Sequence, residues 1–211
     1  MQIAERGLVV IARTVVLMGA IRAWAAAPGL APALLVLFQM VVLRQFLRRL
    51  PAQAPASLPG ALLALAGTAA PLLFRPGRSG PPGVWSCLWP VSPATAVLAG
   101  IIKVAAMFLT VASVAALGRS FGIRPARRRL VTRGPYAVMR HPLYVAEWLC
   151  GAGLCQIHPS PGNLAVLVLT GALLAARARL EERVLAGDPG WEPYRHRVPA
   201  GPWRAVKPPV A

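Results

Sequence analysis

The residues with the clearest chemical potential lie in the stretch RGPYAVMRHPLY, at positions 133–144. Its Gly-Pro pair favours a turn, and Pro142 suits the first turn of a helix, where a missing N–H is no loss. A helix that begins near Pro142 would place Tyr144, Glu147 and Trp148 on one face. The stretch therefore predicts a polar helix start that directly precedes an apolar run.

Two further features of this helix bear on chemistry. His141 would lie at the helix start, where free N–H groups favour an anionic group such as a carboxylate. Glu147 lies within the apolar run, and a carboxylate there needs a cation, a proton or a polar cavity. For Tyr144 and Trp148, anchoring at the membrane interface is the alternative, because aromatic belts are common at that depth.

A second polar group occupies positions 176–199, which read ARARLEERVLAGDPGWEPYRHRVP. It contains the adjacent carboxylates Glu181 and Glu182, followed by a Gly/Pro break and then by Tyr194. We expect the preceding apolar run to continue as a helix into this charged stretch. The two glutamates and Arg140 would then form a polar pocket at the membrane surface. The alternative is a solvated helix face on which the glutamates pair with nearby arginines.

The composition indicates an integral membrane protein. Of 211 residues, 56% are hydrophobic and only 14% are charged, whereas a soluble domain has about 25% charged residues. There are 23 Lys and Arg against 6 Asp and Glu, and the arginines gather between apolar runs. This placement favours anchoring against anionic lipid headgroups and argues against a nucleic-acid partner. The three cysteines show no Cys/His spacing that suggests a metal site.

Six apolar segments are available to position these residues. About 20 apolar residues cross a bilayer core as a helix. The first four segments approach that length, and the last two are short enough to form a tight hairpin with its turn at HPSPGN. The sequence therefore predicts an all-α, polytopic integral membrane helical bundle of about six transmembrane segments with a cytoplasmic C-terminal tail. The segments are Leu8–Ala25, Leu30–Leu47, Leu58–Phe74, Val91–Leu117, Leu143–Ile157 and Leu164–Ala176.

The basic residues assign an orientation to these segments. Arginines cluster at 43–57, at 118–141 and in the C-terminal tail, whereas the opposite side receives only Arg75 and Arg78. By the positive-inside rule both termini are cytoplasmic, and the expected location is a bacterial inner membrane. The first polar stretch would then lie at the cytoplasmic end of the fifth helix.

The polar groups divide the chain into two parts. Residues 1–118 are expected to form transmembrane helices on the side of a lipophilic substrate, and the deepest charges in them are Arg13 and Lys103. Residues 119–211 carry both polar groups, the hairpin and the cytoplasmic tail. We therefore expect the chemistry in the second part.

The two polar groups together resemble the isoprenylcysteine carboxyl methyltransferases and the related membrane phospholipid methyltransferases. The pattern of these enzymes is Gly-Pro-Tyr, then Arg-His-Pro-x-Tyr, an apolar hairpin, Glu-Glu, and an aromatic-rich tail that ends in Tyr-Arg-x-Arg-Val-Pro. The residues that match it are Gly134, Pro135, Tyr136, Arg140, His141, Pro142, Tyr144, Glu181, Glu182, Tyr194, Arg195, Arg197, Val198 and Pro199.

The resemblance implies an enzyme that uses S-adenosylmethionine at the cytoplasmic face. A glutamate can hold the ammonium of the cofactor, and His141 with the helix-start N–H groups can hold its carboxylate. Tyr144 and Trp148 could border the adenine or the sulfonium. The residues expected to bind the cofactor are Tyr136, Arg140, His141, Pro142, Tyr144, Trp148, Glu181, Glu182 and Tyr194.

Methyl transfer is an in-line displacement that needs alignment and desolvation more than an acid or a base. A carboxylate or thiolate acceptor needs no base, whereas an amine would need Glu147 to take its proton. Arg140 or Arg195 could orient a carboxylate acceptor. The sequence thus predicts methylation of a lipophilic small molecule or lipid through a carboxylate, thiol or amine. The alternatives are a sterol-reductase-like membrane enzyme with a nicotinamide cofactor, and a non-enzymatic membrane protein or transporter.

Overall fold

The computed structural model confirms the all-α class for the part of the chain that it describes. Every element of regular secondary structure in that part is a helix. The described residues are 14, 17–22, 25–26, 29–48, 58–75, 83–121 and 130–201. The first expected segment, Leu8–Ala25, lies largely outside them, and its described residues are helical.

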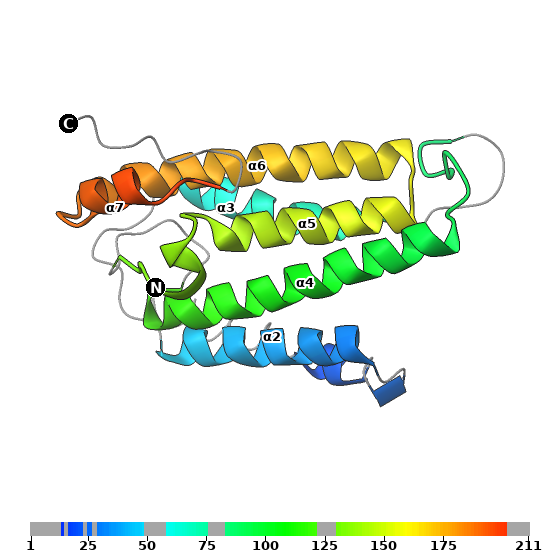
Figure 1. Ribbon diagram of the computed structural model, residues 1–211, viewed down its shortest axis with the longest axis horizontal. Coiled ribbons are helices and arrows are strands. Elements are labelled where there is room, and N and C mark those ends of the chain that lie inside the picture. The colour runs from blue at the N-terminus through cyan, green and yellow to red at the C-terminus, as the bar shows by residue number, and fades with distance from the viewer. Residues whose placement is uncertain are drawn as a thin grey trace.

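Long helices that lie side by side build the molecule (Figure 1). α4 packs against α5 and α2, while α6 packs against α5 and α3. The α-helices are α2 (Leu30–Arg48), α3 (Leu58–Ala69), α4 (Pro93–Leu117), α5 (Pro142–Ile157), α6 (Pro161–Leu185) and α7 (Trp191–Arg197). Short 3-10 helices are η1 (Ala70–Leu73), η2 (Gly118–Ser120) and η3 (Gly134–Ala137).

Serine caps define where two of the long helices begin. Ser92 accepts a hydrogen bond from the Thr95 backbone N–H before α4, and Ser160 accepts one from Asn163 before α6. A proline follows each serine at the first helical position, where it costs no hydrogen bond. The turn between α5 and α6 is therefore shorter than the expected HPSPGN, because α6 already begins at Pro161.

The hairpin has arms of unequal length. α5 has 16 residues and is short, as expected, but α6 has 25 residues. α6 is the longer arm because the helix extends on both sides of the short apolar run expected at 164–176. The charged stretch after the apolar run continues the same helix, as the sequence predicted, and so α6 carries Glu181 and Glu182.

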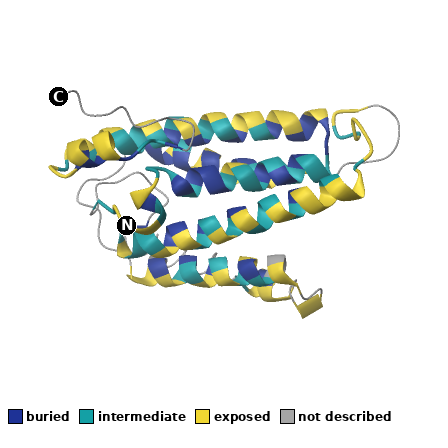
Figure 2. Ribbon diagram, viewed as in Figure 1, coloured by how far each residue is buried: buried dark blue, intermediate teal, exposed yellow. Residues whose placement is uncertain are grey.

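Two helical segments among the described residues are long and apolar enough to cross a membrane, 93–120 and 161–185. Shorter apolar stretches lie in α2, at 33–45, and across α3 and η1, at 59–73. Many large apolar residues of the helices are exposed, among them Leu62, Ile101 and Val168. Figure 2 shows exposed residues in yellow along each of the long helices. These features indicate a membrane protein, while six crossings and the orientation of the termini stay predictions.

The arginine-rich ends of the helices gather at one end of the bundle. The Arg119 side chain, after α4, donates from Nε to the Arg48 carbonyl oxygen at the end of α2, over 3.2 Å. The start of α5, the end of α6 and α7 lie at this same end (Figure 1). The polar residues of both motifs are therefore brought to the end of the bundle that the arginine pattern singled out.

Candidate functional site

A turn before α5 sets the position of the first motif. Gly134 has a φ of 60°, in the left-handed region that glycine adopts at no steric cost. It is the first residue of the 3-10 helix η3, which packs against α4. Pro142 then occupies the first turn of α5 and is buried. The expected turn and helix start are thus both present, and they direct His141 toward α6.

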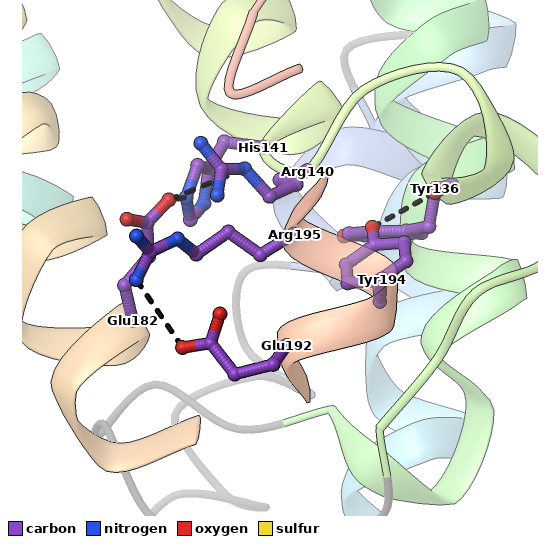
Figure 3. Close-up of polar contacts among 7 residues, drawn as sticks. All are labelled: Tyr136, Arg140, His141, Glu182, Glu192, Tyr194 and Arg195. Carbon is purple, nitrogen blue, oxygen red and sulfur yellow. Dashed lines mark hydrogen bonds and ion pairs between the residues drawn. The ribbon is translucent and has the colours of Figure 1, made fainter. Parts of the chain in front are cut away.

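The first cluster joins the two motifs across the hairpin. His141 Nε2 lies 2.9 Å from Glu182 Oε1, and Arg140 Nε lies 3.5 Å from the same oxygen. Figure 3 shows all three side chains converging between the start of α5 and the end of α6. The Arg140 Nε atom is buried and makes no hydrogen bond with a described residue, so its interaction with Glu182 is one of charge.

A second cluster forms around the neighbouring carboxylate. The Tyr144 hydroxyl donates to Glu181 Oε1, and Arg177 Nε lies 3.4 Å from that oxygen. The Arg177 guanidinium carbon lies 5.2 Å from the centroid of the Tyr144 ring. The rings of Tyr144 and His141 stack in parallel with centroids 5.6 Å apart. The stacked rings join the two glutamate clusters into one site.

Both glutamates are held by one oxygen only. Every hydrogen bond and ion pair that Glu181 and Glu182 make with described residues involves Oε1. The Oε2 atoms therefore remain able to accept hydrogen bonds from a ligand. Glu182 is about a quarter exposed, with 28% of its side-chain surface accessible, so a ligand from the aqueous side can reach it.

Helix α7 folds back onto the first motif. The Tyr194 hydroxyl donates to the Tyr136 carbonyl oxygen over 2.8 Å, and the Arg140 backbone N–H donates to the Pro199 carbonyl over 2.8 Å. The Arg140 guanidinium lies 5.7 Å from the centroid of the Trp191 ring, within reach of a cation–π contact. Burial raises the pKa of Tyr194 to about 12, so its hydroxyl is a proton donor at neutral pH.

Two further residues that the sequence predicted for the site, Glu147 and Trp148, lie further along α5. Glu147 is partly buried on α5, within electrostatic range of Arg177 and Tyr144. The Trp148 indole packs against Gly171 of α6, where an added Cβ would lie 3.0 Å from the indole nitrogen. Trp148 is 39% exposed. It contacts α6 at Gly171 and does not belong to the two glutamate clusters.

Two residues at the edge complete the set of sequence predictions. Arg195 extends from α7 in the direction of Glu182 (Figure 3), and its ion pair is with Glu192 at 3.4 Å. Burial raises the pKa of Tyr136 well above its usual range, so this phenol is neutral. The structure thus brings together Arg140, His141, Tyr144, Glu181 and Glu182, with Tyr136, Tyr194 and Arg195 around them.

Arg177 and Thr68 also belong to the site. The sequence indicates Arg177, with Arg179 and Arg183, only as a partner of the glutamates on a solvated helix face. The ion pair between Arg177 and Glu181 is present at a spacing of four residues, but only 8% of the Arg177 side chain is exposed. Arg177 Nη1 also lies 3.5 Å from the Thr68 hydroxyl on α3. No local pattern could have predicted this contact, because 109 residues separate the two positions.

Residues 91–187 match the family model described as phospholipid methyltransferase. This match confirms the resemblance drawn from the motifs, and it includes both glutamates and the stretch RGPYAVMRHPLY. Enzymes of this type generally use S-adenosylmethionine. Among the described residues, no group of three or more His, Cys, Asp or Glu could hold a metal ion.

Two curated relatives are similar over part of the chain. The cobalt-zinc-cadmium resistance protein CzcN of Cupriavidus metallidurans is 45% identical over 73 residues, which cover 34% of each protein. The nickel-cobalt-cadmium resistance protein NccN of Alcaligenes xylosoxydans xylosoxydans is 34% identical over 109 residues, 50% of this chain and 51% of that protein. The chain therefore spans only 34% and 51% of these relatives. No solved structure matches the chain.

Proposed function

We propose that this protein transfers a methyl group from S-adenosylmethionine to a lipophilic small molecule or lipid at the cytoplasmic face of the membrane. The observation that carries this proposal is the 2.9 Å contact between His141 Nε2 and Glu182 Oε1. It joins two motif halves that lie 41 residues apart in the chain. The phospholipid methyltransferase match over 91–187 supports the reaction class.

The side chains fit the polar groups of the cofactor. S-adenosylmethionine carries an ammonium, a carboxylate and ribose hydroxyls, and the Oε2 atoms of Glu181 and Glu182 can accept from the ammonium or the hydroxyls. Arg140 pairs with Glu182 through Nε, and its other N–H groups could donate to a ligand carboxylate near the start of α5. The other expected cofactor-binding residues would pack against these polar side chains; they are Tyr136, Pro142, Tyr144 and Tyr194.

The chemical step asks little acid–base work of the chain. The bound cofactor supplies a methyl group on a sulfonium. The chain holds the cofactor, aligns the acceptor and excludes water, and the docking of α7 on the first motif favours this exclusion. For an amine acceptor, Glu147 is our candidate base; for a carboxylate acceptor, Arg140 or Arg195 would orient it. Thiol acceptors also remain open.

Ligand binding tests this proposal most directly. We would purify the protein in neutral detergent and measure the affinity for S-adenosylmethionine and S-adenosylhomocysteine by calorimetry. His141→Ala and Glu182→Ala should each weaken binding, whereas Glu192→Gln, a change at an exposed glutamate of α7, should leave it unchanged. Wild-type affinity in both site variants would sink the site assignment. A thermal shift from a nicotinamide cofactor alone would select the reductase alternative.

The acceptor needs a separate experiment. Membranes that contain the protein would be incubated with S-adenosylmethionine labelled in its methyl group, and the extracted lipids would be analysed for label. We expect a labelled lipophilic product that is absent with Glu182→Ala. Label that stays in the aqueous fraction would contradict a lipophilic acceptor.

The names of the curated relatives suggest a physiological role for the methylation. Both are metal resistance proteins, and cobalt and cadmium occur in both names. We propose that methylation by this chain contributes to tolerance of these metals. A strain that lacks the protein should grow less well on cobalt or cadmium, and wild type should restore growth where Glu182→Ala does not. If Glu182→Ala restores growth as well as wild type does, metal tolerance does not depend on methyl transfer.

A further inference from the structure

Arg177 is a buried cation whose contacts reach three helices. Its Nη1 lies 3.5 Å from the Thr68 hydroxyl on α3, and its guanidinium lies against the Tyr144 ring on α5. Its Nε lies 3.4 Å from Glu181 Oε1, one turn further along α6. A guanidinium with so little solvent is costly unless its charge is balanced and its N–H groups are satisfied. Glu181 balances the charge, and the contacts of Nε and Nη1 hold the side chain in place.

Glu181 receives two donors on the same oxygen. The Tyr144 hydroxyl and Arg177 Nε both approach Oε1, from α5 and from α6. Two donors from different directions restrict rotation of the carboxylate, and the direction of Oε2 follows from that restriction. With only one of the donors, the carboxylate could rotate and present Oε2 elsewhere.

We propose that Arg177 is a positioning residue that orients Glu181, so that Oε2 meets a donor of the cofactor. This inference rests on the proposed function. Arg177 acts through Glu181 and Tyr144 rather than by touching the cofactor. Thr68 belongs to the same arrangement, since its hydroxyl lies beside Arg177 Nη1 and donates to the Ala64 carbonyl within α3. A helix from the first part of the chain thus supports the site.

A double-mutant cycle separates positioning from a merely structural role. The affinity for S-adenosylmethionine would be measured for Arg177→Met and Glu181→Gln, singly and together. Each single change should weaken binding about tenfold, the size expected for one lost charged hydrogen bond. The double variant should bind about as well as Glu181→Gln, because Arg177 acts through that carboxylate. The same cycle with Glu182→Gln should instead be additive.

Matched variants control for charge and for folding. Arg179→Met removes an exposed arginine from the same helix and should leave the affinity unchanged. Arg177→Lys keeps the charge but loses the planar group that reaches both Glu181 and Thr68, so it should recover only part of the affinity lost in Arg177→Met. Thr68→Val is nearly isosteric and should weaken binding by about twofold to fivefold, a loss that disappears in the Glu181→Gln background.

Specific results would overturn the proposal. Arg177→Met with wild-type affinity would do so, as would a tenfold loss that persists in the Glu181→Gln background. If Arg177→Met does not fold, the Thr68→Val cycle decides, and an additive result there rejects the proposal. Wild-type protein that binds neither S-adenosylmethionine nor S-adenosylhomocysteine would overturn the proposed function itself. That outcome is distinct from a wild-type protein that binds while its Arg177 variants are unchanged.

Discussion

The hydrogen bond from Tyr194 to the Tyr136 carbonyl predicts how firmly α7 is held. Tyr194→Phe removes the hydroxyl and leaves a carbonyl without its donor, at a site where Tyr194 is 3% exposed. The cost of an unsatisfied buried group is about 1–3 kcal/mol. For a protein of this size, 1 kcal/mol corresponds to a Tm change of about 2–4 °C. A loss of about 2 kcal/mol would therefore lower the Tm by about 4–8 °C.

Thermal unfolding in neutral detergent, followed by tryptophan fluorescence, would measure this change. Tyr136→Phe is the matched control, because it removes a phenol hydroxyl but keeps the Tyr136 backbone carbonyl that accepts the bond from Tyr194. We expect its Tm to stay within about 2 °C of wild type. If Tyr194→Phe and Tyr136→Phe had the same Tm, the hydrogen bond would contribute nothing and the reasoning would be refuted.

The pH dependence of the same pair gives a second readout. Burial raises the pKa of Tyr194 from 10.0 to about 12 in the folded protein. The protonated hydroxyl therefore stabilises the fold fully below pH 10, and this contribution is lost as the pH rises from 10 to 12. The Tm difference between wild type and Tyr194→Phe should shrink over that range. A difference that grows with pH would contradict the assignment.

Three further predictions concern the turn, the hairpin and the candidate base. Gly134→Ala should cost about 1–2 kcal/mol because alanine is strained at a φ of 60°, and a lower Tm would show it. Gly162→Ala would bring a Cβ within 2.5 Å of the Trp85 ring, so it should lower the Tm while leaving the affinity for S-adenosylhomocysteine unchanged. Glu147→Gln should slow methyl transfer to an amine at least about tenfold and spare a carboxylate acceptor, as competing acceptors in one assay would reveal.

The hairpin shows what could be read from the sequence. Pro142 and the Gly-Pro turn are local signals, and both the turn and the start of α5 are where they were expected. The meeting of Arg140 and Glu182 was also foreseeable, because antiparallel neighbours return the chain to its starting level. The apolar run of the sixth segment is short, but the charged stretch after it continues the helix to Leu185, as the sequence predicted.

Several long-range contacts could not be predicted from the sequence, for physical reasons. The Tyr194 hydroxyl donates to the backbone carbonyl of Tyr136. Because every residue has a backbone carbonyl, the sequence gives no sign of which one accepts this bond. The packing of Trp148 on Gly171 depends on the rotation of α6 relative to α5. Thr68 became a neighbour of Arg177 only through the packing of α3 on α6. Each of these contacts required the relative placement of helices, which periodicity alone does not give.

That rotation of α6 can itself be tested. One alanine inserted after Ala172 would turn the rest of the helix by about 100° and shift it by about 1.5 Å. Glu181 and Glu182 would then leave Tyr144 and His141, although every residue of the site is still present. We expect the affinity for S-adenosylmethionine to fall more than about tenfold, while circular dichroism shows unchanged helix content.

An alanine inserted after Gly201, beyond α7, is the control for this experiment. It leaves the register of α6 intact, so it should preserve binding. If both insertions bind like wild type, the glutamates do not need the geometry of the hairpin, and a site built from the two motifs is wrong. If only the insertion in α6 abolishes binding, residue identity is insufficient. The site then depends on the register with which α6 returns along α5.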